Sequence, residues 1–114
     1  MELVIKSFTN SLSFGLFHQD EGQVGCARMI TDKATFAYLG DVFIAENHRG
    51  RGLGDWLMEV ILAHPELQGL RRMMLATSDM HSLYAKFGFK APAKPEILME
   101  KLDPKIARVL YEEE

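Results

Sequence analysis

The spacing of hydrophobic and polar residues predicts the main elements of the chain. Residues 13–18 and 23–30 read as two strands around a turn, which predicts an antiparallel hairpin. The run 37–45 is apolar on both faces, as is typical of a central strand. Residues 53–64 and 71–77 follow as a helix and a strand, so a crossover helix joins two parallel strands. The helix stripe comprises Leu53, Trp56, Leu57, Val60 and Ile61.

The two ends of the chain add shorter elements. Residues 2–10 predict a short helix, or the tail of one. Residues 79–87 predict a later helix, and Gly88 is the natural residue just past its end. Residues 96–102 read as a last strand, and 103–110 as a helical turn or two. The order of elements indicates one α/β (α+β) domain with a mixed sheet, built from all 114 residues.

Composition narrows the class of protein. Hydrophobic residues make up 47% of the chain and charged residues 25%, which fits one folded domain. The net charge of -3 argues against a nucleic-acid partner. The single cysteine, Cys26, excludes an intrachain disulfide and a cysteine-based metal site, and no metal is expected. No apolar run reaches the ~20 residues of a membrane span and no signal peptide opens the chain, so we expect a cytoplasmic protein without membrane contact.

A glycine-rich loop carries the candidate chemistry. Residues 46–55 read ENHRGRGLGD, placed between the apolar strand and the helix. The first turn of a helix leaves backbone N–H groups without partners, and glycine lets a ligand approach them closely. Arg49 and Arg51 add forked donors suited to phosphate. The loop therefore predicts a cradle for a pyrophosphate, with a plain tight turn as the alternative.

Two familiar phosphate loops do not fit these residues. The nucleoside triphosphate loop needs Gly-Lys-Ser/Thr, whereas Gly54 is followed by Asp55 and Trp56. In the dinucleotide fingerprint, Asp55 would occupy the third glycine position, where close helix packing leaves no room for a carboxylate. One strand-helix-strand unit is also too little for a dinucleotide domain.

A third kind of loop fits. Arg49-x-x-Gly52-x-Gly54, after an apolar strand and opening a helix, resembles the acetyl-CoA loop of the GNAT N-acetyltransferase superfamily. The segment 83–89, LYAKFGF, resembles the late helix of that family. The resemblance covers roughly residues 11–101 and implies a GNAT-like fold. Only residues 2–10 precede the hairpin, so most of the family's N-terminal strand and helices are expected to be missing.

The resemblance implies an enzyme that transfers an acetyl group from acetyl-CoA to a primary amine. The acceptor would be a small molecule or a protein, attacking directly in a ternary complex. The alternative is a non-catalytic coenzyme A or acyl-CoA binding module, and a second rival is an interaction subunit. The implied pyrophosphate ligands are Arg49, Gly50, Arg51, Gly52, Leu53 and Gly54. The pantetheine arm would lie along the backbone of Val42, Phe43 and Ile44.

Three residues are candidates for proton transfer. The resemblance gives Tyr84 the role of protonating the leaving thiolate, with a core aromatic as the alternative. Asp41, expected on the same strand face as Leu39 and Phe43, could be a base, an acceptor-binding group or a structural acid. His81 is a second candidate base, with a solvated histidine as the alternative. A chain of waters could also remove the proton from the amine.

A short N-terminal region has a consequence for assembly. In the family, the missing pieces form part of the wall of the acceptor site. Their absence would uncover one edge and one face of the sheet near Phe14, Phe17 and Val24. We therefore expect a homodimer in which the partner covers this gap.

Overall fold

A mixed sheet of four strands, in the order β1-β2-β3-β4, organises the chain. The computed structural model describes residues 9–111. The strands are β1 (Leu12–His18), β2 (Gly22–Thr31), β3 (Phe36–Ile44) and β4 (Arg72–Leu75). The first three strands pair antiparallel, whereas β3 and β4 run parallel. The hairpin, the central position of the third strand and the parallel crossover are thus confirmed.

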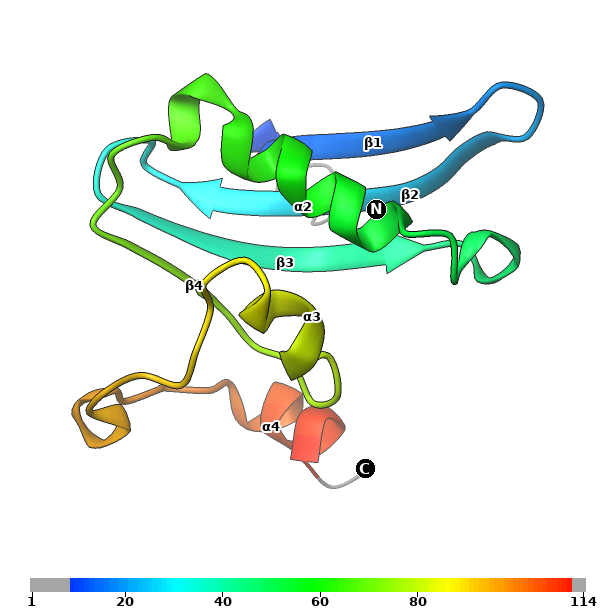
Figure 1. Cartoon of the computed structure of the whole chain (residues 1–114). Coiled ribbons are helices and arrows are strands. Elements are labelled where there is room, and N and C mark those ends of the chain that lie inside the picture. The colour runs from blue at the N-terminus through cyan, green and yellow to red at the C-terminus, as the bar shows by residue number, and fades with distance from the viewer. Residues whose placement is uncertain (1–8, 112–114) are drawn as a thin grey trace.

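The helices gather on one side of the sheet and beyond its β4 edge. They are α2 (Leu53–Ala63), α3 (His81–Ala85) and α4 (Pro104–Tyr111), with 3₁₀ turns η1 (Glu46–His48), η2 (Pro65–Leu67) and η3 (Pro95–Ile97). Figure 1 shows α2 lying across one face of the β1–β3 strands, while α3 and α4 lie past β4. The helix expected over 2–10 falls almost entirely outside the described residues. Within the described part of the chain, no helix is both long and apolar enough to cross a membrane.

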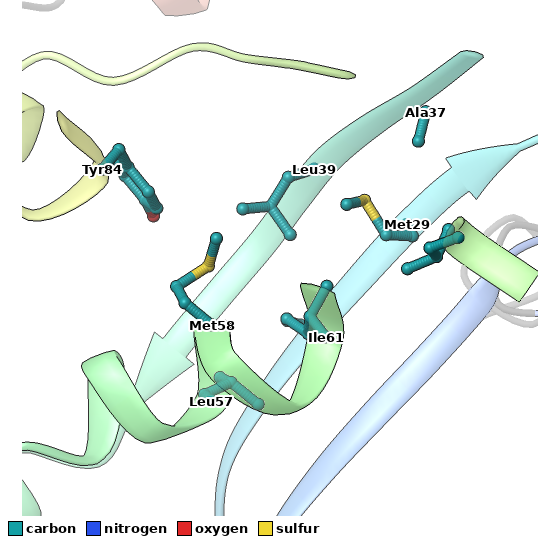
Figure 2. Close-up of a cluster of buried hydrophobic side chains, with 9 residues drawn as sticks. Met29, Ala37, Leu39, Leu57, Met58, Ile61 and Tyr84 are labelled. Carbon is teal, nitrogen blue, oxygen red and sulfur yellow. The ribbon is translucent and has the colours of Figure 1, made fainter. Parts of the chain in front are cut away.

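The core lies between α2 and the sheet. Met58 and Ile61 of α2 are almost fully buried against Met29 of β2 and Leu39 of β3 (Figure 2). Burying one such side chain contributes about 1.5–3 kcal/mol. Trp56, which the sequence placed on the buried face of the helix, is 52% exposed. The face of α2 that packs on the sheet is therefore rotated about the helix axis relative to the prediction. The buried residues of α2 are Leu57, Met58 and Ile61.

The strand predicted over residues 96–102 is wrong. The structure forms the short turn η3 and an irregular segment there, and Met99 is 96% exposed. Pro92 and Pro95 lie just before this segment in the sequence, and proline lacks the N–H group that pairing between strands needs. The four residues of β4 also offer only a short edge for pairing. Apolar composition therefore did not suffice to form a strand.

A β-bulge in β3 breaks the alternation on which the placement of Asp41 depended. Cys26 of β2 pairs with Phe43, but Arg28 pairs with Gly40, so β3 holds one extra residue between these pairs. Asp41 has a positive φ of 54° at this bulge. Its carboxylate accepts a hydrogen bond from Arg28 Nε at 2.7 Å, on the face opposite the core. The prediction that Asp41 shares a face with the buried Leu39 is therefore wrong.

The gap expected near the hairpin is smaller than predicted. Val24 is buried and Phe14 packs against the core, leaving only Phe17, 70% exposed, among these three residues. The homodimer stays a prediction.

The connection between β2 and β3 depends on Asp32. Its carboxylate accepts from the Thr35 hydroxyl at 2.6 Å and from the backbone amides of Ala34, Thr35 and Phe36. These bonds favour the ionised form, so the Thr35 hydroxyl first and then the backbone amides hold the pKa of Asp32 well below its ordinary value. The charged carboxylate thereby holds the turn that leads into β3.

Asp32→Ala is expected to lower the melting temperature at neutral pH, because four donors lose their acceptor. A group with a depressed folded pKa stabilises the protein above its unfolded pKa, and this contribution disappears as the pH falls through the folded pKa. The difference in melting temperature between wild type and variant should therefore shrink in acid, as measured by circular dichroism. Asp20→Ala, in the β1–β2 turn, is the matched control because the carboxylate of Asp20 makes no hydrogen bond to any of residues 9–111. Equal melting temperatures for wild type and Asp32→Ala would contradict the prediction.

Candidate functional site

The glycine loop between β3 and α2 adopts a backbone that ordinary residues rarely reach. Gly50 and Gly52 have φ values of 79° and 77°, in the left-handed region where a Cβ atom is strained. Gly52 is the N-cap residue of α2, and as a glycine it has no side chain that could accept a hydrogen bond from the first helix amides. The helix therefore begins with its first amides uncovered by any capping group.

Backbone amides point out of this loop without protein acceptors. The amide of Arg49 donates to the Glu46 carbonyl, and the amide of Trp56 donates to the Gly52 carbonyl at 3.1 Å. Between them, in the described part of the chain, no protein acceptor is recorded for the amides of residues 50–55. The helix dipole adds partial positive charge at the same place. An anion is the ligand that such a group of donors can satisfy.

A cavity of about 520 Å³ opens in front of these amides. The end of β3, the loop, the start of α2 and the helix α3 surround it. Nine of the site residues expected from the sequence line it, namely Val42, Phe43, Ile44, Arg49, Gly50, Gly52, Leu53, Gly54 and Tyr84. The other lining residues are His48, Asp55, Asp79, Met80 and Leu83.

The end of β3 offers an open backbone edge to this cavity. The parallel pairing with β4 covers only residues 36–39 and ends where Leu39 meets Leu75. Beyond that point β3 continues through Val42 to Ile44 without β4 beside it. An extended ligand can add to such an edge by backbone hydrogen bonding. The open edge therefore results from the early end of β4.

Tyr84 lies between this cavity and a second one of similar volume. The second cavity, also about 520 Å³, is lined by β4, α3 and the segment after Phe89, and it includes His81. Figure 2 shows Tyr84 projecting from α3 toward Met58 and Leu39. Tyr84 is 7% exposed, and its ring packs edge-on against that of Phe89, with 6.1 Å between the two ring centres. Tyr84 thus belongs to the core and borders both cavities.

Burial raises the pKa of Tyr84, and the negative charge of Asp79 raises it further. Both effects disfavour the phenolate, since a charged oxygen is poorly solvated there and repelled by a carboxylate. The hydroxyl therefore keeps its proton up to higher pH than an exposed tyrosine does. This is the protonation state that a proton donor requires.

The other two candidates for proton transfer lie outside the loop cavity. Asp41 is 53% exposed at its side chain and pairs with Arg28, so it is not a buried carboxylate. His81 begins α3 and borders the second cavity. Neither residue lines the cavity in front of the loop, and their roles stay predictions.

The two loop arginines direct their guanidinium groups to protein partners. Arg49 Nε donates to the Ile44 carbonyl at 2.9 Å, and its guanidinium lies 5.8 Å from the centre of the Phe43 ring. Arg51 does not line the cavity, and its Nη1 lies 3.4 Å from His48 Nδ1. In this structure the loop presents mainly backbone donors to the cavity. Contact between either guanidinium and a phosphate stays a prediction.

His48 is a site residue that sequence reasoning missed. Its exposed fraction is 3%, and it lines the cavity inside the glycine loop motif. Its ring Nε2 contacts the carboxylate of Glu21, a residue that the sequence placed in an ordinary turn. Nothing in the local pattern signalled burial, because the contact joins residues 27 positions apart.

An ion pair joins the two helices that border the cavity. Lys86 Nζ lies 2.9 Å from both carboxylate oxygens of Asp55. Asp55 belongs to the first turn of α2, and Lys86 is the C-cap of α3. Both side chains are largely exposed, so the pair contributes at most about 1 kcal/mol to stability. Its main effect is to fix the α3 end of the cavity near the loop.

Comparison with known proteins gives a consistent result. The profile of the Acetyltransferase (GNAT) domain matches residues 11–91. A Gibberella zeae protein named as a candidate acetyltransferase is 48% identical over 67 residues, covering 56% of this chain and 37% of that protein. The chain thus spans little more than a third of the length of this curated relative.

Solved structures share the fold. A crystal structure of a Xanthomonas campestris protein assigned to the GNAT family is 55% identical, with a TM-score of 0.85 over 90% of this chain and 72% of that one. A GNAT family acetyltransferase from Elizabethkingia anophelis, solved with acetyl-CoA bound, has a TM-score of 0.65 at 16% identity. It covers 89% of this chain and 71% of that one, and supports the fold alone.

Proposed function

The chain belongs to the GNAT acetyltransferase family, and from this premise we propose that it transfers an acetyl group from acetyl-CoA to a primary amine. The acceptor is a small molecule or an exposed amine of a protein. The observation that carries the proposal is the row of unpaired amides at residues 50–55, facing a cavity beside the open end of β3. These two features match a ligand with a diphosphate at one end and an extended amide-bearing arm.

The residues present fit the diphosphate, the pantetheine arm and the thioester of acetyl-CoA. The diphosphate would accept hydrogen bonds from the loop amides, where the helix dipole adds attraction. The pantetheine amides would pair with the backbone near Val42 and Ile44, as an added strand. The thioester would then lie near Tyr84, where β3 continues past the end of β4. The Elizabethkingia acetyltransferase, which shares the fold, was solved with acetyl-CoA bound, and the family membership of this chain motivates the same choice of ligand here.

The proposed reaction is a direct attack in a ternary complex. The neutral amine nitrogen forms a bond to the thioester carbonyl carbon, and the carbonyl electrons move to its oxygen. Collapse of this intermediate breaks the carbon–sulfur bond, and the Tyr84 hydroxyl protonates the departing thiolate. The amine proton leaves to Asp41, His81 or water.

A calorimetric titration of the full chain with acetyl-CoA tests the proposal. We expect one binding site whose affinity falls as salt is raised, because salt screens the attraction between the charged diphosphate and the positive end of the helix dipole. A panel of amines with detection of free thiol then tests transfer. Binding without thiol release on any amine would favour the non-catalytic coenzyme A binding module. Absence of binding in low salt would overturn both readings and favour the interaction subunit.

A further inference from the structure

His48 forms a polar link between the hairpin and the glycine loop. Among the described residues, His48 is the only one with a polar side chain that is buried, and 3% of its surface is exposed. Its Nε2 contacts the Glu21 carboxylate in the β1–β2 turn. The other oxygen of Glu21 accepts a hydrogen bond from Asn47 Nδ2 at 3.3 Å. On the opposite side of the ring, Nδ1 faces Arg51 Nη1 at 3.4 Å.

The two partners of His48 determine where its proton sits. A carboxylate accepts hydrogen bonds, so the nitrogen that faces Glu21 must carry hydrogen. A guanidinium only donates, so the nitrogen that faces Arg51 must be bare. The neutral imidazole with hydrogen on Nε2 satisfies both partners. In this state Arg51 is held against His48 and stays out of the cavity.

A bound diphosphate would change this balance. His48 lines the cavity and Arg51 Nη1 lies 3.4 Å from its ring, so an anion bound beside His48 would lie close to both groups. If Nδ1 takes up a proton from solvent, it can no longer accept from Arg51, and the two cations repel. The guanidinium then becomes available to the diphosphate, while Glu21 remains the counter-charge of the imidazolium.

Among the described residues, His18 is a further titratable group beside His48, and its Nδ1 lies 3.7 Å from the Glu21 carboxylate. The ring of His18 on β1 lies 5.2 Å from the His48 ring, centre to centre. His18 Nδ1 already accepts from the backbone amides of Asp20 and Glu21, at 3.0 and 3.3 Å. A proton on that nitrogen would break the turn that presents Glu21. His48 is therefore the residue whose protonation releases Arg51 while leaving the turn intact.

We propose that Glu21 and His48 are positioning residues that hold Arg51 beside the cavity, and that diphosphate binding is coupled to protonation of His48, which releases Arg51 toward the ligand. This inference rests on the proposed function, because coenzyme A supplies the diphosphate. Affinity for the ligand should rise as the pH falls, since the protonated site adds one positive charge and frees a second.

The test is calorimetry of the full chain with 3′-dephospho-coenzyme A, which keeps the diphosphate but lacks the titrating phosphomonoester. Titrations in buffers of different ionisation enthalpy measure proton uptake. Wild type should take up a fraction of a proton, at most about one per ligand, and bind more tightly as the pH falls from about 8 to about 6. His48→Gln should show no uptake and no rise in affinity. His64→Gln, next to η2 and away from the loop cavity, is the matched control and should retain the uptake.

Nitrogen chemical shifts of the His48 ring add a readout that does not depend on any variant folding. The unliganded protein should show hydrogen on Nε2 alone, and the complex should show hydrogen on both nitrogens. Binding without proton uptake, uptake that survives in His48→Gln, or hydrogen on Nδ1 in the unliganded protein would each overturn the coupling and leave the proposed function standing. Absence of binding at every pH would overturn both the coupling and the proposed function.

Discussion

Replacing Tyr84 with phenylalanine is expected to lower kcat by about 10²–10⁴-fold, the usual contribution of a positioned proton donor. The ring would keep its contact with Phe89 and its place in the core. Only the hydroxyl is lost, so the thiolate must leave without a proton donor. The Kd for coenzyme A should stay nearly unchanged, because the proposed diphosphate and pantetheine contacts lie on the loop and on β3.

The pH dependence of the wild-type enzyme gives a second sign of the same role. Burial and then Asp79 raise the pKa of Tyr84, so the hydroxyl remains protonated in mildly alkaline solution. A loss of kcat due to ionisation of Tyr84 should therefore occur above the ordinary tyrosine pKa of about 10. Asp79→Asn should shift this loss of kcat at high pH to lower pH, because the carboxylate that repels the phenolate is removed.

Tyr38→Phe is the matched control for Tyr84→Phe. Tyr38 lies on β3, where its side chain is 36% exposed and lines none of the cavities described above. The same loss of a hydroxyl there should leave kcat unchanged. Turnover is measured by release of free thiol, after the fold of both variants has been checked by circular dichroism. Wild-type kcat in Tyr84→Phe would remove this residue from the mechanism and support its alternative reading as a core aromatic.

Gly52→Ala is expected to weaken acetyl-CoA binding by about ten-fold or more. An L-residue in the left-handed region costs about 1–2 kcal/mol, and 1.4 kcal/mol corresponds to a factor of ten in affinity. Gly52 caps α2 at a φ of 77°, and nothing lies within 4 Å of the position that a Cβ would occupy. Because Gly52 lines the cavity, relief of the strain would move the amides that face the diphosphate.

Gly69→Ala separates this effect from backbone strain in general. Gly69 has a φ of 76° and equally open space around its Cβ position, but it lies after η2 and away from the loop cavity. Both variants should lose similar stability in thermal melts. Only Gly52→Ala should raise the Kd for acetyl-CoA in calorimetry. Equal affinity in the two variants would show that the loop backbone does not bind the ligand.

The sequence alone predicted the part of the fold that local patterns encode. The hairpin, the parallel pair and α2 follow from apolar periods and turn residues that lie within a few positions of one another. The glycine loop was recognisable for the same reason, since Gly50, Gly52 and the helix that follows are contiguous. The predicted loop and strand residues accordingly come together around one cavity.

Local patterns failed where pairing or packing decides the outcome. The 96–102 segment has the composition of a strand, yet it forms no ladder after Pro92 and Pro95. The face assigned to Asp41 assumed strict alternation, which the bulge in β3 breaks. A bulge is defined by the register with the neighbouring strand, and a single strand's sequence does not contain that register.

The sequence by itself indicated the family, the glycine loop and the residues that we propose for acetyl transfer. Only the tertiary structure decided that Tyr84 borders both cavities from a core position, and that Glu21 and His48 meet across 27 positions to hold Arg51. The physical reason is that loop amides and helix starts are set by neighbouring residues. Burial and charge pairing are instead set by elements that meet only when the sheet has formed.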